Sequence, residues 1–122
     1  MYPSAERCPS CSSADWVAVP QVLVMSNLHR EEVMHRDLKL ENVMVDENGD
    51  LYLIDFGLAY LKGRDNKGDK SDGIPLQYDY MGTQCNMAPE ILNEKGYDDK
   101  VDTWALGVMI YEMGCGKVRF AG

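Results

Sequence analysis

Residues 43–54 contain the pattern that most restricts the fold, two short apolar runs on either side of the acidic segment Asp46–Asp50. An Asn-Gly pair at the centre of such a segment is a strong signal of a β-hairpin, because both residues tolerate a positive φ. With this pair as a two-residue turn, the strand register continues back to Asn42 opposite Asp55. Facing residues of an antiparallel pair lie roughly 4.5–5.5 Å apart. The turn therefore predicts an amide oxygen and a carboxylate close together at the open end of the hairpin.

The pattern of apolar residues and prolines in the remaining sequence predicts helices separated by polar loops. Nine of the thirteen residues 101–113 are apolar, which is typical of a buried helix. Pro20 suits the first position of a helix that ends near Arg30, and Pro89 suits the start of a short helix over residues 88–93. We expect loops over residues 33–42 and 58–81, because neither segment has a clear period.

The charge balance restricts the partners of the chain. Twelve Lys and Arg residues against twenty Asp and Glu residues give a net charge of -8. Nucleic-acid binding and attachment to anionic lipid both need a concentrated positive face, so we expect neither a nucleic-acid nor a membrane partner. No run approaches the roughly 18 apolar residues of a membrane span, and no secretory signal is evident, so we expect an intracellular, cytoplasmic protein.

Residues 1–19 read as a separate, flexible leader because they are rich in Pro and Ser. Cys8 and Cys11 have the spacing of a CxxC motif, which also begins zinc and redox sites. A structural zinc needs four ligands, and no second pair follows at a suitable spacing. A zinc or redox module therefore stays a distant alternative.

Three polar residues, Asp37, Asn42 and Asp55, form the sharpest chemical set in the sequence. Phosphoryl transfer needs hard oxygen ligands for Mg²⁺ and a carboxylate that orients the attacking hydroxyl. The end of the hairpin supplies the first requirement, and Asp37 lies on a loop that can reach the same place. Lys39 adds a positive charge that is useful where negative charge develops on a transferred phosphoryl group.

Four motifs in this order resemble those of the protein kinase family. The segment His35-Arg36-Asp37-Leu38-Lys39-Leu40-Glu41-Asn42 resembles the kinase catalytic loop, and Asp55-Phe56-Gly57 resembles the metal-binding DFG motif. Ala88-Pro89-Glu90 resembles the end of the activation segment. Asp102-Thr103-Trp104-Ala105-Leu106-Gly107 resembles the start of the central buried helix of the kinase C-lobe.

The resemblance covers roughly residues 20–122 and implies an α+β fold, namely a mostly helical C-lobe core with a short β-hairpin that carries the metal site. It implies a partial kinase catalytic domain, in which the N-lobe and the last helices are absent. The implied activity is that of a serine/threonine protein kinase, which transfers the γ-phosphoryl group of ATP to Ser or Thr hydroxyls of a protein substrate with Mg²⁺. The lysine at position 39, two residues after Asp37, resembles the catalytic loop of the serine/threonine class of kinases.

The resemblance also implies a role for each matching residue. Asp37 accepts the proton of the substrate hydroxyl or orients it, with Lys39 beside it, and Asn42 and Asp55 bind Mg²⁺. Met44 packs under adenine and Ile54 borders the same pocket. The residues that support the loops structurally are His35, Phe56, Gly57, Glu90 and Asp102. Among them, Asp102 matches a buried carboxylate that holds the backbone of the catalytic loop, and Glu90 lacks the later arginine that normally pairs with it.

The segment from Gly82 and Thr83 to Met87 resembles the substrate-docking loop, with Asn86 in place of the usual tyrosine. Arg36 normally binds a phosphothreonine three residues before the glycine, and here that position is Asp79. A carboxylate can form a weaker charge-assisted bond with the guanidinium. We therefore expect Asp79 to order the loop partly without phosphorylation.

A second functional class stays open. A lone C-lobe lacks the Gly-rich loop and the lysine that hold the ATP phosphates, so this chain by itself is expected to be inactive. It would then serve as a non-catalytic interaction protein that binds other kinase chains or substrates. The mass of the endogenous polypeptide separates these two readings, and metal analysis of the purified chain tests the zinc or redox alternative.

Overall fold

Two long helices and two short antiparallel strand pairs form most of the computed structural model, which describes residues 12–62, 64 and 73–115. The elements follow in the order α1 (Ser12–Arg30), β1 (Val33–Met34), η1 (Leu40–Asn42), β2 (Val43–Val45), β3 (Leu51–Leu53), β4 (Tyr60–Leu61), η2 (Gln84–Asn86), α2 (Pro89–Leu92) and α3 (Lys100–Cys115). Helices and strands are thus mixed, as the sequence predicts. The helix predicted near Pro89 and the long helix predicted over residues 101–113 are both confirmed.

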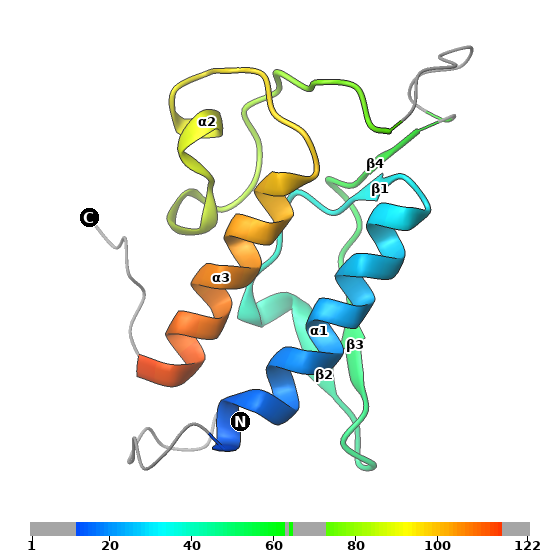
Figure 1. Cartoon of the computed structure of the whole chain (residues 1–122), viewed down its shortest axis with the longest axis vertical. Coiled ribbons are helices and arrows are strands. Elements are labelled where there is room, and N and C mark those ends of the chain that lie inside the picture. Colours follow the sequence, from blue (N-terminus) through cyan, green and yellow to red (C-terminus); the bar gives the residue numbers. More distant parts are fainter. Residues whose placement is uncertain (1–11, 63, 65–72, 116–122) are drawn as a thin grey trace.

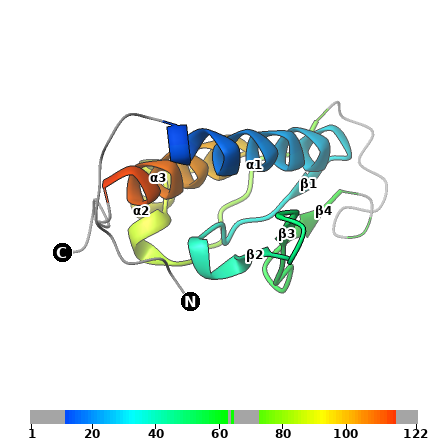
Figure 2. The same ribbon diagram turned by 90° about the horizontal axis from the view of Figure 1, so that it is seen from below.

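The helices α1 and α3 lie side by side in one layer, with the strands and the connecting loops on one side of it (Figures 1 and 2). β1 pairs with β4, and β2 pairs with β3. Because β1 directly precedes residues 35–39 and β4 follows residues 55–57, the first pair brings these two segments together. The second pair is the hairpin that the sequence predicts.

The register of this hairpin differs by one residue from the prediction. Val45 pairs with Leu51 and Val43 pairs with Leu53, so Asn42 faces Ile54 rather than Asp55. Only Gly49 has a positive φ, +86°, in a three-residue loop. The carboxylate of Asp46 favours this longer loop, because its Oδ1 accepts the N–H groups of Asn48 and Asp50 at 2.8 and 2.9 Å.

The helix α1 begins at Ser12, so the start predicted at Pro20 is wrong. Pro20 lies in the helix interior, where it cannot donate the usual hydrogen bond to the carbonyl four residues earlier. The helix therefore crosses the expected boundary between residues 19 and 20, and the Cys8 and Cys11 predictions lie outside the described residues. Neither α1 nor another helix in the described ranges is both long enough and apolar enough to cross a membrane.

The helix α3 contributes to both clusters of buried side chains. Val101 packs with Met34, Ile91 and others, whereas Met109 packs with Leu38 and other residues nearer α1. The prediction of a buried helix is confirmed for one side of α3, whereas Trp104 and Tyr111 remain 38% and 41% exposed. The buried side is nevertheless what fixes the catalytic-loop segment, since Leu38 is only 3% exposed against α3.

Candidate functional site

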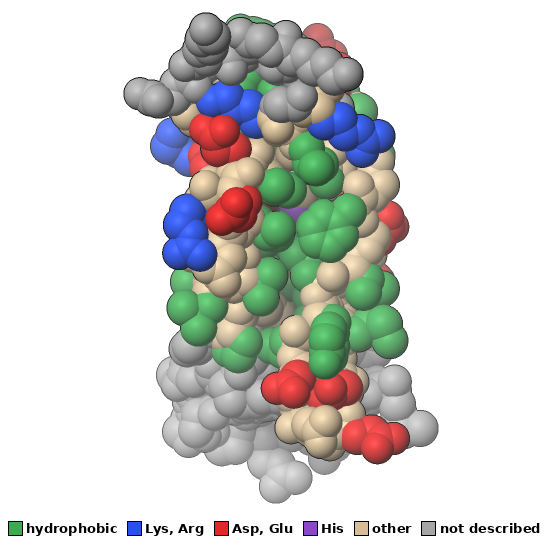
Figure 3. Space-filling model, turned by 90° about the vertical axis from the view of Figure 1, so that its right-hand side faces the viewer, with side chains coloured by type: hydrophobic (Ala, Val, Ile, Leu, Met, Phe, Trp, Pro, Cys, Tyr) green, Lys and Arg blue, Asp and Glu red, His purple; other side chains and the backbone are tan. Residues whose placement is uncertain are grey.

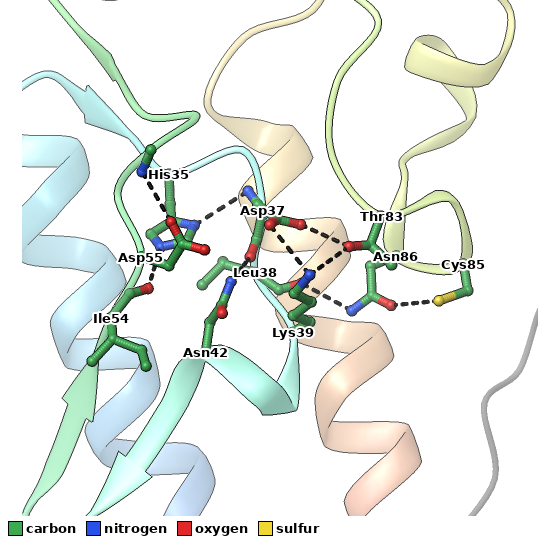
Figure 4. A network of polar contacts seen from close by, with 11 residues as sticks. His35, Asp37, Leu38, Lys39, Asn42, Ile54, Asp55, Thr83, Cys85 and Asn86 are labelled. Carbon is green, nitrogen blue, oxygen red and sulfur yellow. Dashed lines mark hydrogen bonds and ion pairs between the residues drawn. The ribbon is translucent and has the colours of Figure 1, made fainter.

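The carboxylate of Asp37 lies at the centre of a polar network between residues 35–42 and the loop at Thr83 (Figure 4). Thr83 Oγ1 donates to Asp37 Oδ1 at 2.8 Å, and Lys39 Nζ lies 3.4 Å from Asp37 Oδ2. Lys39 Nζ also donates to Thr83 Oγ1 at 3.0 Å. The carboxylate is thus held in one orientation beside an ammonium group. A group held in this way can accept the proton of an incoming hydroxyl.

Asn42 and Asp55 lie at the open end of the hairpin, although not as a facing pair. Asn42 Nδ2 donates to the carbonyl of Asp37 at 2.8 Å, so the amide links the hairpin to the Asp37 loop and keeps its own oxygen available. Asp55 has a positive φ of 60°, and its Oδ1 accepts the N–H of Gly57 at 3.2 Å. A positive φ outside glycine is rare and costs free energy, and it often marks a functional position.

These oxygen atoms fit Mg²⁺. The amide oxygen of Asn42 and the carboxylate of Asp55 are hard ligands, and Mg²⁺ is usually held by one or two such groups together with phosphate oxygens and water. In the described residues, no group of three or more His, Cys, Asp or Glu side chains could hold a metal ion. Mg²⁺ does not require such a group, so the donor set suits a metal that arrives with a phosphorylated substrate.

His35 connects the two segments of the site. The imidazole is fully buried, its Nδ1 accepts the N–H of Asp37 at 3.2 Å, and its Nε2 lies 3.2 Å from the carbonyl of Ile54. Because Nδ1 accepts, the proton resides on Nε2, which then donates to that carbonyl. Phe56 packs edge-on against the ring with 4.9 Å between the centroids. His35 therefore ties the position of Asp37 to the residues that precede Asp55.

Asp102 anchors the backbone before Asp37. Its carboxylate, at 1% residue exposure, accepts the N–H of His35 at 2.8 Å and the N–H of Arg36 at 2.9 Å. Arg36 has a positive φ of 68°, and the two hydrogen bonds offset the cost of this conformation. A carboxylate in a largely apolar helix needs such donors, because burial of an unpaired charge is costly.

Comparisons with known proteins show the family of the chain. Residues 13–122 match the protein kinase domain. The chain belongs to the protein kinase family. It is 38% identical over 117 residues to the human RAC-beta serine/threonine-protein kinase, covering 96% of the chain and 23% of that protein. It is 33% identical over 123 residues to the serine/threonine-protein kinase akt-2 of Caenorhabditis elegans, covering 99% of the chain and 22% of that protein.

A third relative, the hormonally up-regulated neu tumor-associated kinase homolog B of Xenopus laevis, is 42% identical over 103 residues, which cover 81% of the chain and 15% of that protein. The kinase chain therefore spans about a fifth of the length of the first two relatives. The match to the kinase domain begins at residue 13, whereas we expected the matching part to start at residue 20.

Arg36 joins the segment that carries Asp37 to residues 58 and 79. Its Nε donates to the carbonyl of Leu58 at 2.6 Å, and its Nη1 lies 3.5 Å from Asp79 Oδ2. Asp79 is 62% exposed at its side chain, so this is a loose ion pair rather than a buried one. The backbone of Gly82, with a φ of +112°, lies close to the backbone of Arg36. A Cβ on Gly82 would lie 2.7 Å from the Arg36 carbonyl oxygen. Only glycine fits this approach.

The predicted nucleotide-contacting residues are exposed in the kinase chain. Met44 is 55% exposed on β2, and Ile54 is 37% exposed. Phe56, two residues after Ile54, is 44% exposed. Figure 3 shows hydrophobic side chains gathered on one face of the molecule. In the ranges 12–62, 64 and 73–115, the side chain of Glu90 forms no ion pair.

His29 contacts the buried carboxylate of Asp102, a role that the sequence did not predict. His29 Nε2 lies 3.0 Å from Asp102 Oδ2 and Nδ1 lies 3.7 Å from Asp99 Oδ2. The imidazole is thus the third donor to the buried carboxylate that holds His35 and Arg36. The available signal was a histidine in the last turn of a helix, four residues before β1, but its partner is 73 residues away.

The contact of His29 predicts a pH dependence of stability. The hydrogen bond to Asp102 raises the pKa of His29, with burial opposing the rise and the carboxylates of Asp99 and Asp98 adding to it. Since the folded pKa exceeds the unfolded value of about 6.5, the contact stabilises the fold fully below that pH and loses this contribution as the pH rises through the folded pKa. We expect urea unfolding to show that the unchanged chain has a higher free energy of unfolding than His29→Gln at pH 6, and that this difference shrinks toward pH 9. An advantage that stays constant across this range would contradict the assignment.

Proposed function

We propose that these residues form the catalytic part of the C-lobe of a serine/threonine protein kinase, which transfers the γ-phosphoryl group of ATP to Ser or Thr hydroxyls of a protein. The observation that carries this proposal is the position of Asp37. Thr83 and Lys39 hold its carboxylate, and its backbone carbonyl accepts a hydrogen bond from the Asn42 amide. The serine/threonine kinases among the relatives support the class of reaction.

In this proposal Asp37 orients the substrate hydroxyl and receives its proton. Lys39, which lies between Asp37 and the docking loop, supplies positive charge beside the transferred phosphoryl group. Asn42 and Asp55 would hold Mg²⁺, and the metal would supply charge neutralisation for the ATP phosphates. Met44 and Ile54, exposed at the hairpin, would contact the adenine ring.

The test is phosphoryl transfer from labelled ATP to a mixture of protein substrates, followed by identification of the phosphorylated amino acid. Intact-mass analysis of the endogenous polypeptide, captured through a peptide of this region, first decides which length of chain is assayed. We expect phosphoserine and phosphothreonine, formed with Mg²⁺ and lost with a chelator. Phosphotyrosine alone, or transfer that survives the chelator, would contradict the proposal.

A non-catalytic interaction protein is the second candidate. The observation that favours it is the exposure of large apolar side chains, Phe56 and Tyr52 among them, since contiguous exposed apolar surface is typical of a surface that binds a partner. In that case neither the 122-residue chain nor the endogenous polypeptide transfers phosphate in the same assay. The chain instead binds another kinase chain or a substrate protein in a direct binding measurement.

Asp79 provides a regulatory prediction that follows from the ion pair with Arg36. We expect Asp79→Ala to lower the transfer rate about two- to fivefold, because an exposed pair of this kind contributes little but orders the loop. Asp50→Ala is the matched control, since Asp50 is an exposed carboxylate on the hairpin turn without an ion pair in the described residues. Equal rates for the Asp79 variant and the control would remove this role.

A further inference from the structure

Asn86 occupies the end of a single 3₁₀ turn that begins at Thr83. The N–H of Asn86 donates to the carbonyl of Thr83 at 2.9 Å and closes the turn. Thr83 is the N-cap residue of η2 and Asn86 is its last residue. Figure 4 shows both side chains directed at the loop that carries Asp37.

Both halves of the Asn86 amide are used within the protein. Its Nδ2 donates to the carbonyl of Leu38 at 2.9 Å, and the thiol of Cys85 donates to its Oδ1 at 3.1 Å. Asn86 is 7% exposed and Leu38 is 3% exposed, so no bulk water replaces the first hydrogen bond when it is lost. The cavity beside them has about 10 Å³, the space of one water molecule at most, so this amide acts on the two loops and not on a ligand.

Leu38 is the residue between Asp37 and Lys39, and Thr83 binds both of those side chains. Three consecutive residues of the loop are therefore held by the two ends of one turn. We infer that Asn86 is a positioning residue, which clamps the docking loop (residues 82–87) to the catalytic loop (residues 35–42) and so fixes where a substrate peptide lies relative to Asp37. This inference rests on the proposed kinase function, and it gives the residue that replaces the usual tyrosine a task of its own.

Hydrogen exchange on the 122-residue chain tests the clamp without any need for activity. Asn86→Leu keeps the size of the side chain and removes the donor to Leu38. The backbone N–H groups of residues 86 and 87 donate to the carbonyls of Thr83 and Gln84. In the variant we expect these two amides to exchange on the order of tenfold faster than in the unchanged chain, relative to amides of α3 such as that of Met109. Asn86→Gln keeps an amide and should restore part of the protection. A uniform acceleration of all amides, or none, would overturn the inference.

Asn93→Leu is the matched control. Asn93 also donates from its amide to a backbone carbonyl, that of Pro89 at 2.8 Å, but it is exposed and this hydrogen bond lies at the end of α2. We expect its variant to leave the exchange of Asn86 and Met87 unchanged. If the Asn93 variant accelerates these amides as much as the Asn86 variant does, the clamp is not specific and the inference fails.

The activity arm separates the clamp from the proposed function. In an active polypeptide that contains this chain, we expect Asn86→Leu to raise the KM for a Ser or Thr peptide on the order of tenfold with the KM for ATP unchanged. Equal changes in both KM values would indicate general damage and overturn the positioning role. If the unchanged protein transfers no phosphoryl group, the proposed function fails, and the exchange result alone then decides whether the clamp exists.

Discussion

Replacing Asp37 by asparagine is expected to lower the rate of phosphoryl transfer about 10²- to 10⁴-fold, the usual contribution of a positioned acid or base. The two side chains have almost the same shape, and the amide oxygen can still accept from Thr83 as the carboxylate does at 2.8 Å. The amide cannot receive a proton from a substrate hydroxyl. It also loses the attraction to Lys39, whose Nζ lies 3.4 Å from the carboxylate.

The expected signature is a fall in kcat with little change in the KM for ATP, because Asp37 would act on the hydroxyl and not on the nucleotide. Asp50→Asn removes an exposed carboxylate from the hairpin turn and serves as the matched control, with an unchanged rate expected. Thermal unfolding of both variants checks that the fold is retained. A folded Asp37→Asn variant with the rate of the control would refute the assignment of Asp37.

Some elements of the fold were predictable, because local signals determine them, whereas β1, η1 and β4 lie in segments that were expected to be loops. The apolar run of α3 and the Pro89 start of α2 follow from hydropathy and from the conformational preference of proline. The hairpin was predictable as well, but its register was not. The Asp46 side chain accepts two turn N–H groups and extends the loop by one residue, which moves Asn42 from Asp55 to Ile54. A single local hydrogen-bonding choice therefore decided which residues face each other.

The site was predictable as a list of residues and not as a network. Motif spacing pointed to Asp37 and Asn42, but the bond from Asn86 to Leu38 joins residues 48 apart, and the bond from His29 to Asp102 joins residues 73 apart. Such contacts depend on how α1, α3 and η2 pack together, which no local pattern determines. The exposed Trp104 on α3 has the same origin, since hydropathy predicts that a side chain prefers burial and not what covers it.

Replacing Asp102 by asparagine is expected to destabilise the chain by about 3 kcal/mol, the range measured when one partner of a buried ionic contact is removed. The carboxylate accepts the N–H groups of His35 and Arg36 on separate oxygens, and Oδ2 also contacts His29. An amide has one oxygen, so one of these donors then faces an NH₂ group. A buried donor without an acceptor costs about 1–3 kcal/mol by itself.

Asp99→Asn is the matched control for this change. Asp99 precedes α3 by one residue, and its carboxylate is 37% exposed and 3.7 Å from His29, so its loss should change the free energy of unfolding by at most about 0.5 kcal/mol. Urea unfolding gives both values, and hydrogen exchange of the His35 and Arg36 amides gives the local effect. Since Arg36 has a positive φ that these bonds maintain, we expect its amide to lose protection before the amides of α1 do. Equal losses for the two variants would mean that Asp102 contributes only to the start of the helix, and the position of Asp37 would then need another anchor.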